Sequence, residues 1–118
     1  MSSEARDWVF RIGHILEAIE RILAYTHGMT REQFLSNPQV ADAVVRNFIT
    51  IGEAPRYIPS DVQSAHPRVP WADMRAMRNF LIHGYDQVEL RVVWDTVARD
   101  LPGLPPLLQE VMETRYGR

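Results

Sequence analysis

The stretch MRAMRNFLIHGY, residues 74–85, holds the strongest structural signals in the chain. Met74, Met77 and Leu81 are spaced by three and four residues, which places them on one side of a helix. Gly84 suits the position just past a helix end, because glycine adopts a positive φ at little cost. We therefore predict an amphipathic helix that buries its apolar stripe and ends at this glycine, with His83 in its last turn.

The opposite side of this helix is polar. Arg75, Asn79 and His83 recur there at i, i+4 and i+8, and Arg78 lies between the two faces. A spacing of five residues separates Arg78 from His83 by about 140° around a helix. The two side chains can meet on one ligand if the arginine reaches round, if the helix ends at Gly84, or if a second copy of the chain supplies the other half. The combination is typical of a phosphate-handling site.

Composition describes an ordinary globular protein. The chain has 118 residues, 46% apolar and 24% charged, which predicts a single domain over residues 1–118. It contains no cysteine, so disulfides and thiolate metal sites are excluded. No apolar run approaches the ~18 residues of a membrane span, and the N-terminus has no signal-peptide pattern, so we expect a cytoplasmic protein without membrane contact. The net charge of −2 does not favour RNA, so RNA binding would need a local cluster such as Arg68, Arg75 and Arg78.

The rest of the chain is helical by pattern. Apolar periodicity predicts helices over about 4–25, over 37–54 with Asn37 and Pro38 at its start, and from the capping box at 86–89 onward. Capping boxes at 30–33 and 60–63 predict two short helices. Pro102-Gly103 interrupts the last helix, which continues to about Thr114. With no strand pattern, we predict an all-α antiparallel bundle of about four main helices with short additional ones.

The ordered residues of the central stretch carry a family resemblance. Arg78, His83 and Tyr85 match the motif R-x4-H-x-Y, and the flanking segments agree in order: Ile51-Gly52-Glu53-Ala54, Pro70-Trp71, Val93-Trp94 and Asp100-Leu101-Pro102. Over nearly its full length the chain resembles the HepT-like toxins of the HEPN superfamily. The resemblance implies a HEPN-like helical bundle and a metal-independent endoribonuclease of a type II toxin–antitoxin system. It also implies that Arg78 and His83 are catalytic, in a cleft between two protomers.

The residues are consistent with that chemistry. His83 suits proton transfer near neutral pH, and the Arg78 guanidinium matches two phosphoryl oxygens of a charged phosphorane. Cleavage of RNA by its own 2′-hydroxyl needs neither metal nor cofactor, and the spacing of the four histidines predicts no metal site. We expect Asn79 to orient His83 or a substrate phosphate. Glu53 either holds the motif arginine or a neighbouring backbone, or is a surface acid, solvated or paired with Arg56.

The resemblance further implies a partner. A cognate minimal nucleotidyltransferase antitoxin would neutralise the toxin by transferring AMP to Tyr85. We also predict a homodimer, because Ala72 and Ala76 would let another backbone approach the face that carries Asn79 and His83. The alternative function is a non-catalytic HEPN module that binds nucleotides or a partner and is associated with a nucleotidyltransferase. A purely structural dimerisation bundle is disfavoured by the polar face of the motif helix.

Overall fold

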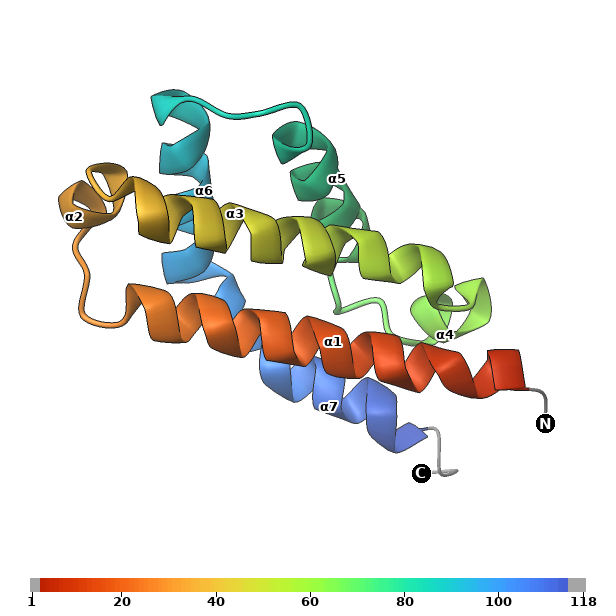
Figure 1. The fold of residues 1–118 in the computed structure, drawn as a ribbon. Helices are drawn as coiled ribbons and strands as arrows, with labels where there is room; N and C mark the ends of the chain where they lie inside the picture. The colour runs from red at the N-terminus through yellow and green to blue at the C-terminus, as the bar shows by residue number, and fades with distance from the viewer. Residues whose placement is uncertain (1–2, 115–118) are drawn as a thin grey trace.

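The computed structural model describes residues 3–114, with the side chains of residues 8–114. Its elements are α1 (Ser3–Thr26), α2 (Arg31–Leu35), α3 (Pro38–Glu53), η1 (Ala54–Tyr57), α4 (Ser60–Ala65), α5 (Trp71–Leu81), α6 (Gln87–Arg99), η2 (Leu101–Gly103) and α7 (Leu104–Thr114), where η marks a 3₁₀ turn (Figure 1). No strand occurs in this part of the chain, and the all-α prediction is confirmed. None of the described helices is long and apolar enough to cross a membrane.

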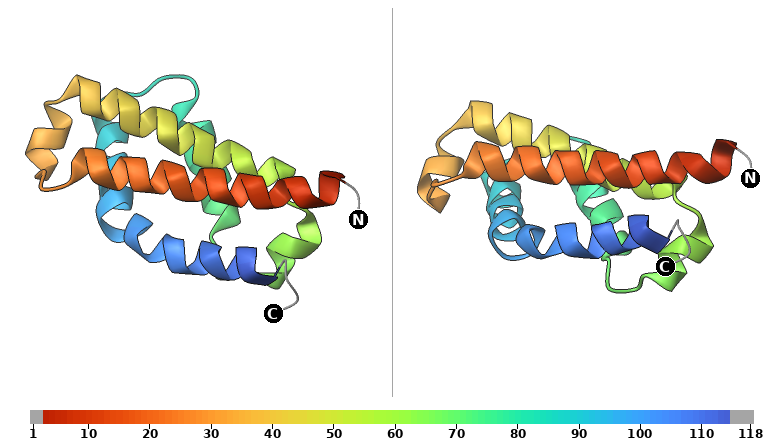
Figure 2. Two further views of the ribbon diagram at one scale, coloured as in Figure 1. Left: turned by 60° about the horizontal axis from the view of Figure 1, so that its bottom comes forward. Right: turned by 90° about the horizontal axis from the view of Figure 1, so that it is seen from below.

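The long helices form an antiparallel frame. α1 and α3 lie side by side in opposite directions, and α7 runs back along α1 (Figures 1 and 2). α5 and α6 run steeply across this frame and are joined by the loop that carries the end of the motif (Figure 1). Each fully buried aliphatic or aromatic side chain contributes roughly 1.5–3 kcal/mol to folding. The core draws such residues from all five long helices: Ile15, Ile19, Phe48, Met74, Leu81, Val93 and Leu108.

Side-chain caps explain where several helices begin. Thr30 and Gln33 form the predicted capping box of α2, with both hydrogen bonds present. At α3, Asn37 Oδ1 accepts a hydrogen bond from the Val40 amide at 3.1 Å, and Pro38 occupies the first turn. Asp86 starts α6 with a complete capping box. The positions of these helix starts could be predicted from the sequence, because a side-chain cap depends only on residues that are neighbours in the chain.

The capping box predicted at 60–63 is wrong. Ser60 is the first residue of α4, and Pro59 occupies the cap position without a side-chain hydrogen bond. Gln63, which would have closed the box, instead donates Nε2–H to the carbonyls of Pro55 and Ile58 at 2.9 and 3.0 Å. Its amide therefore ties α4 to η1, a tertiary role that local spacing does not reveal.

The end of the motif helix also differs from the prediction. α5 ends at Leu81, so His83 lies beyond the helix rather than in its last turn. The chain turns at once, because the Gly84 amide donates to the Leu81 carbonyl at 3.1 Å. Gly84 has a φ of +104°, which confirms the positive φ expected there. The break between α6 and α7 at Pro102-Gly103 is also confirmed, with η2 at that point.

Candidate active site

The motif helix is fixed against α3 by a close approach of the two backbones. A Cβ placed on Gly52 would lie 2.2 Å from Arg78 Cβ and 2.5 Å from the Met74 carbonyl oxygen. Both distances are far below any real contact, so no larger residue fits without moving a helix. Gly52 is itself buried. Ala72 and Ala76, where a second copy of the chain is predicted to approach, are exposed and take no part in this contact.

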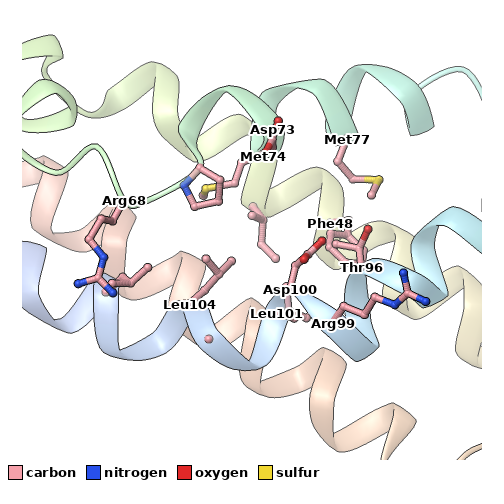
Figure 3. Close-up of a pocket in the computed structure, with 14 residues that line it drawn as sticks. Phe48, Arg68, Asp73, Met74, Met77, Thr96, Arg99, Asp100, Leu101 and Leu104 are labelled. Carbon is pink, nitrogen blue, oxygen red and sulfur yellow. The ribbon is translucent and has the colours of Figure 1, made fainter.

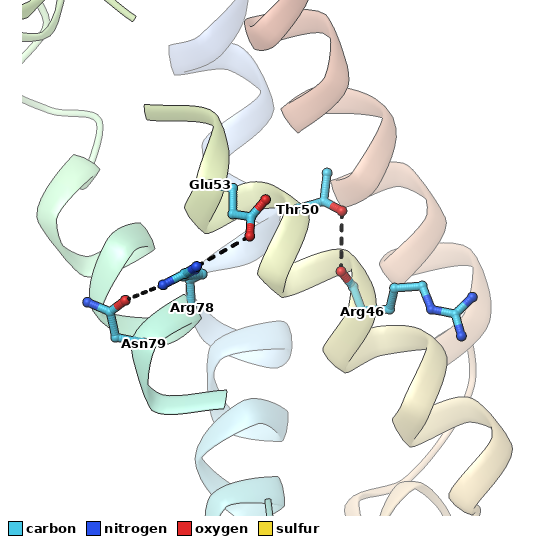
Figure 4. A network of polar contacts seen from close by, with 5 residues as sticks. All are labelled: Arg46, Thr50, Glu53, Arg78 and Asn79. Carbon is cyan, nitrogen blue, oxygen red and sulfur yellow. Dashed lines mark hydrogen bonds and ion pairs between the residues drawn. The ribbon is translucent and has the colours of Figure 1, made fainter. Parts of the chain in front are cut away.

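Contacts on both arms hold the Arg78 guanidinium. Its Nη2 lies 3.5 Å from Glu53 Oε1, and its Nη1 donates to Asn79 Oδ1 at 3.0 Å (Figure 4). The Nε atom is buried, and no acceptor for it is found among the described residues. The side chain of Arg78 is 24% exposed and that of Glu53 47% exposed, so the pair orients the arginine more than it stabilises the fold. Of the two interpretations of Glu53, the structure supports contact with the motif arginine.

Asn79 does not take the partner that its spacing predicts. Its side-chain oxygen accepts from Arg78, and no hydrogen bond joins it to His83 among the described side chains. The reason is the early end of α5: an i, i+4 pair faces one another only while the helix continues. The side-chain amide of Asn79 thus orients the motif arginine, Arg78.

A cavity of about 220 Å³ opens beside Arg78 between the end of α3, η1 and α5. Its lining consists of Gly52, Glu53, Arg56, Arg75, Arg78 and Asn79, and we call it the arginine cavity. Arg75 also donates Nη1–H to Gln63 Oε1 at 3.2 Å. Of the predicted basic cluster, Arg75 and Arg78 are brought together here, whereas Arg68 is not.

Sequence reasoning missed two residues of this cavity. Arg56 was considered only as a surface partner of Glu53, and Gly52 only as part of a family segment. The available signal for Arg56 was its position three residues after Glu53 in a segment that continues the helical path of α3 through η1. No single-sequence signal reveals Gly52, because the need for glycine arises from the neighbouring helix.

A larger cavity of about 520 Å³ lies on the other side of α5, between α5, α3 and the segment from α6 to α7 (Figure 3). Phe48, Met74, Met77, Leu101 and Leu104 give it an apolar wall. Four charged residues of mixed sign also line it: Arg68, Asp73, Arg99 and Asp100. No motif residue reaches it, so this cavity has no evident catalytic group.

The second half of the motif lies in the loop between α5 and α6. His83 is exposed, and Tyr85 is partly buried against the core. The next residue, Asp86, accepts hydrogen bonds from the amides of Val88 and Glu89 at 2.9 and 3.2 Å, which anchors the loop to α6. Within the described part of the chain, His83 does not line the arginine cavity. One chain alone therefore does not bring Arg78 and His83 into a common pocket.

The other histidines lie away from the motif. His14 and His27 are exposed. His66 is tied into the packing near the end of α7, with Nε2 at 3.3 Å from Thr114 Oγ1 and its carbonyl accepting from Trp71 Nε1 at 3.1 Å. Trp71 is 6% exposed and belongs to the core. Over residues 8–114, whose side chains the structure describes, there is no group of three or more histidine and acidic side chains placed to hold a metal ion.

Comparison with known proteins identifies the family. The family model described as ribonuclease HepT-like matches residues 15–111. The chain belongs to the HepT-like family. Its resemblance to a "Probable ribonuclease HepT" of Thermococcus cleftensis reaches 44% identity over 90 residues, 76% of this chain and 82% of that protein.

Two other HepT-like relatives carry the name "Putative RNase". One, from Caldanaerobacter subterraneus subsp. tengcongensis, is 33% identical over 85% of this chain and 89% of its own length. The other, from Methanocaldococcus jannaschii, is 33% identical over 87% of this chain and 85% of its own length. No solved structure matches the chain.

Proposed function

We propose that this HepT-like protein is a metal-independent endoribonuclease with Arg78 and His83 as its catalytic residues. The observation that carries the proposal is the placement of Arg78, held by the Gly52 contact and by two side chains at the wall of a cavity lined by three arginines. Preorganised positive charge of this kind favours the extra negative charge that develops on a phosphorane. The names of the relatives support RNA as the substrate class.

The proposed reaction is an internal transfer at phosphorus. The 2′-oxygen of the ribose attacks the adjacent phosphate, and the bond from phosphorus to the 5′-oxygen of the next nucleotide breaks. The products are a 2′,3′-cyclic phosphate and a free 5′-hydroxyl. His83 moves a proton in this step, removing it from the 2′-hydroxyl or delivering it to the leaving 5′-oxygen. Arg78 binds the two non-bridging oxygens with its planar fork.

A second copy of the chain completes the site in this proposal. Arg78 and His83 do not share a cavity within one chain, and α5 carries an exposed row of Ala72, Ala76 and Phe80 at intervals of four. Phe80, which is 43% exposed, adds a large apolar side chain to this row. A homodimer packed on this row would cover it and bring the motif loop of one protomer toward the arginine of the other.

The protein would act as the toxin of a toxin–antitoxin pair. In this proposal a cognate nucleotidyltransferase attaches AMP to the Tyr85 hydroxyl. Tyr85 lies two residues from His83 in the same loop, so a bulky anion there would compete with the RNA phosphate for the catalytic residues. This explains inhibition without any change of fold.

The direct test is RNA cleavage in EDTA by unmodified protein. We expect cutting by the wild type, none by His83→Ala, and unchanged cutting by His14→Ala, which removes an exposed histidine of α1, a helix that carries no motif residue. All three should unfold at similar temperatures, because both histidines are exposed. Cleavage by His83→Ala at the wild-type rate would refute the assigned role. A clean wild type that cuts no RNA would favour the binding-module alternative.

A further inference from the structure

The arginine cavity has the opposite charge balance to the protein that contains it. The whole chain has a formal charge of −2, whereas the cavity lining holds three arginines and a single carboxylate, Glu53. That carboxylate is engaged by Arg78. The charge of Arg56 and Arg75 is therefore not neutralised by the lining itself, and a local excess of this kind attracts anions.

Arg75 is held in place by a neutral group. Both side-chain N–H bonds of Gln63 are directed at carbonyls of the η1 region, which leaves Gln63 Oε1 facing Arg75 at 3.2 Å. An amide oxygen orients a guanidinium without cancelling its charge. Between residues 8 and 114, no carboxylate lies within ion-pair distance of Arg75.

Arg56 lines the same cavity from a turn that is held by buried neighbours. It belongs to η1, the 3₁₀ turn that directly follows α3, and the neighbouring Ala54 and Pro55 are both buried. Its side chain is exposed and, over the same described side chains, pairs with no carboxylate. The turn thus fixes the backbone that carries the Arg56 side chain, while the charge of its guanidinium stays available to a ligand.

We propose that Arg56 and Arg75 form a second phosphate subsite, which binds a backbone phosphate of the RNA next to the one that Arg78 contacts. This inference rests on the proposed function. Because Arg56 and Arg75 line the same cavity as Arg78, a strand whose scissile phosphate lies at Arg78 would bring a neighbouring phosphate toward them. Guanidinium groups bind phosphate through paired N–H donors, and backbone contacts of this type position a strand without reading its bases.

The experiment measures how RNA binding depends on salt. Binding of a short single-stranded oligoribonucleotide without a 5′-phosphate is titrated against NaCl with non-cleaving His83→Ala protein, alone and combined with Arg56→Gln or Arg75→Gln. For single strands each lost phosphate contact lowers the slope of log K against log [salt] by about 0.7. We expect that decrease for each substitution. In the cleaving protein, the same substitutions should raise KM several-fold, and any fall in kcat should be smaller than the rise in KM.

The matched control is Arg31→Gln, which removes an exposed arginine at the start of α2, away from η1 and the end of α3 (Figure 1). Salt slopes and KM values equal to those of this control, in a protein that cuts RNA, would overturn the subsite and leave the proposed function standing. A wild type that binds but never cuts would overturn the proposed function, and a slope decrease in Arg56→Gln would still support the subsite. An effect seen only with a 5′-phosphorylated oligonucleotide would overturn the assignment to a backbone phosphate.

Discussion

Replacing Gly52 by alanine tests whether the contact between α3 and α5 positions Arg78, the arginine proposed to be catalytic. The added Cβ would lie 2.2 Å from Arg78 Cβ, whereas ordinary contacts begin at 3.4 Å, so the helices must separate by roughly 1 Å. Its second neighbour is the carbonyl oxygen of Met74. Neither atom is the free end of a side chain, so the backbone of α5 has to move.

The expected cost follows from two opposing effects. Overpacking a tight contact costs about 1–3 kcal/mol, while alanine in place of glycine in a helix recovers up to roughly 1 kcal/mol. We expect Gly52→Ala to lose about 1–2 kcal/mol of unfolding free energy, equivalent to a fall of roughly 3–10 °C in Tm for a domain of this size. Because a displacement of 1 Å at a catalytic group can reduce the rate about 100-fold, kcat should fall by roughly that factor.

Urea unfolding and steady-state RNA cleavage measure the two effects. The matched control is Gly13→Ala in α1, where an added Cβ meets nothing within 4 Å. That variant should gain roughly 0.5–1 kcal/mol from helix propensity and keep full activity. If Gly52→Ala behaves like Gly13→Ala in both assays, the close contact does not position Arg78 and the reasoning is wrong.

Four further predictions concern the motif loop and the exposed row of α5. Gly84→Ala should cost roughly 1–2 kcal/mol in urea unfolding, because an L residue is strained at a φ of +104°; unchanged stability would contradict this. Asp86→Ala should lower the free energy of unfolding by about 1 kcal/mol because it removes the cap of α6, whereas Asp86→Asn should keep most of that stability. Equal losses of stability in the two variants would show that the cap is not the cause. Tyr85→Phe should still cut RNA but gain no AMP mass when co-expressed with the cognate nucleotidyltransferase, and a mass increase in that variant would move the modification elsewhere. Phe80→Glu should give a monomer by light scattering and lose cleavage, whereas a monomeric wild type with full activity would exclude the shared site.

The sequence predicted those features that depend on neighbouring residues. The capping boxes at Thr30 and Asp86, the positive φ of Gly84 and the break at Pro102 all follow from local backbone chemistry, and all are found in the structure. The apolar periodicity likewise predicted the positions of the long helices. The family motif singled out Arg78 as a candidate site residue. Its contact with Glu53, which the structure shows, was one of the two interpretations of that glutamate.

The features that escaped prediction depend on elements distant in sequence. Gln63 fits a capping box by spacing, but its amide bonds to two carbonyls of the preceding turn instead. Gly52 is required only because Arg78 and Met74 approach it from another helix. Arg56 joins the cavity because η1 continues the path of α3 toward α5. In each case the deciding neighbour lies several to many residues away.

Because α5 ends at Leu81, the motif is divided between a packed helix and the loop that follows it. Arg78 is held by the packed pair of α3 and α5, whereas His83 and Tyr85 belong to a loop that is anchored by the turn at Gly84 and by the cap of α6. A change in the length or stiffness of that loop would displace the imidazole while the arginine cavity kept its shape. Under the proposed function, RNA binding and proton transfer therefore depend on different parts of the fold, and we expect an altered loop to abolish cleavage while RNA binding is retained.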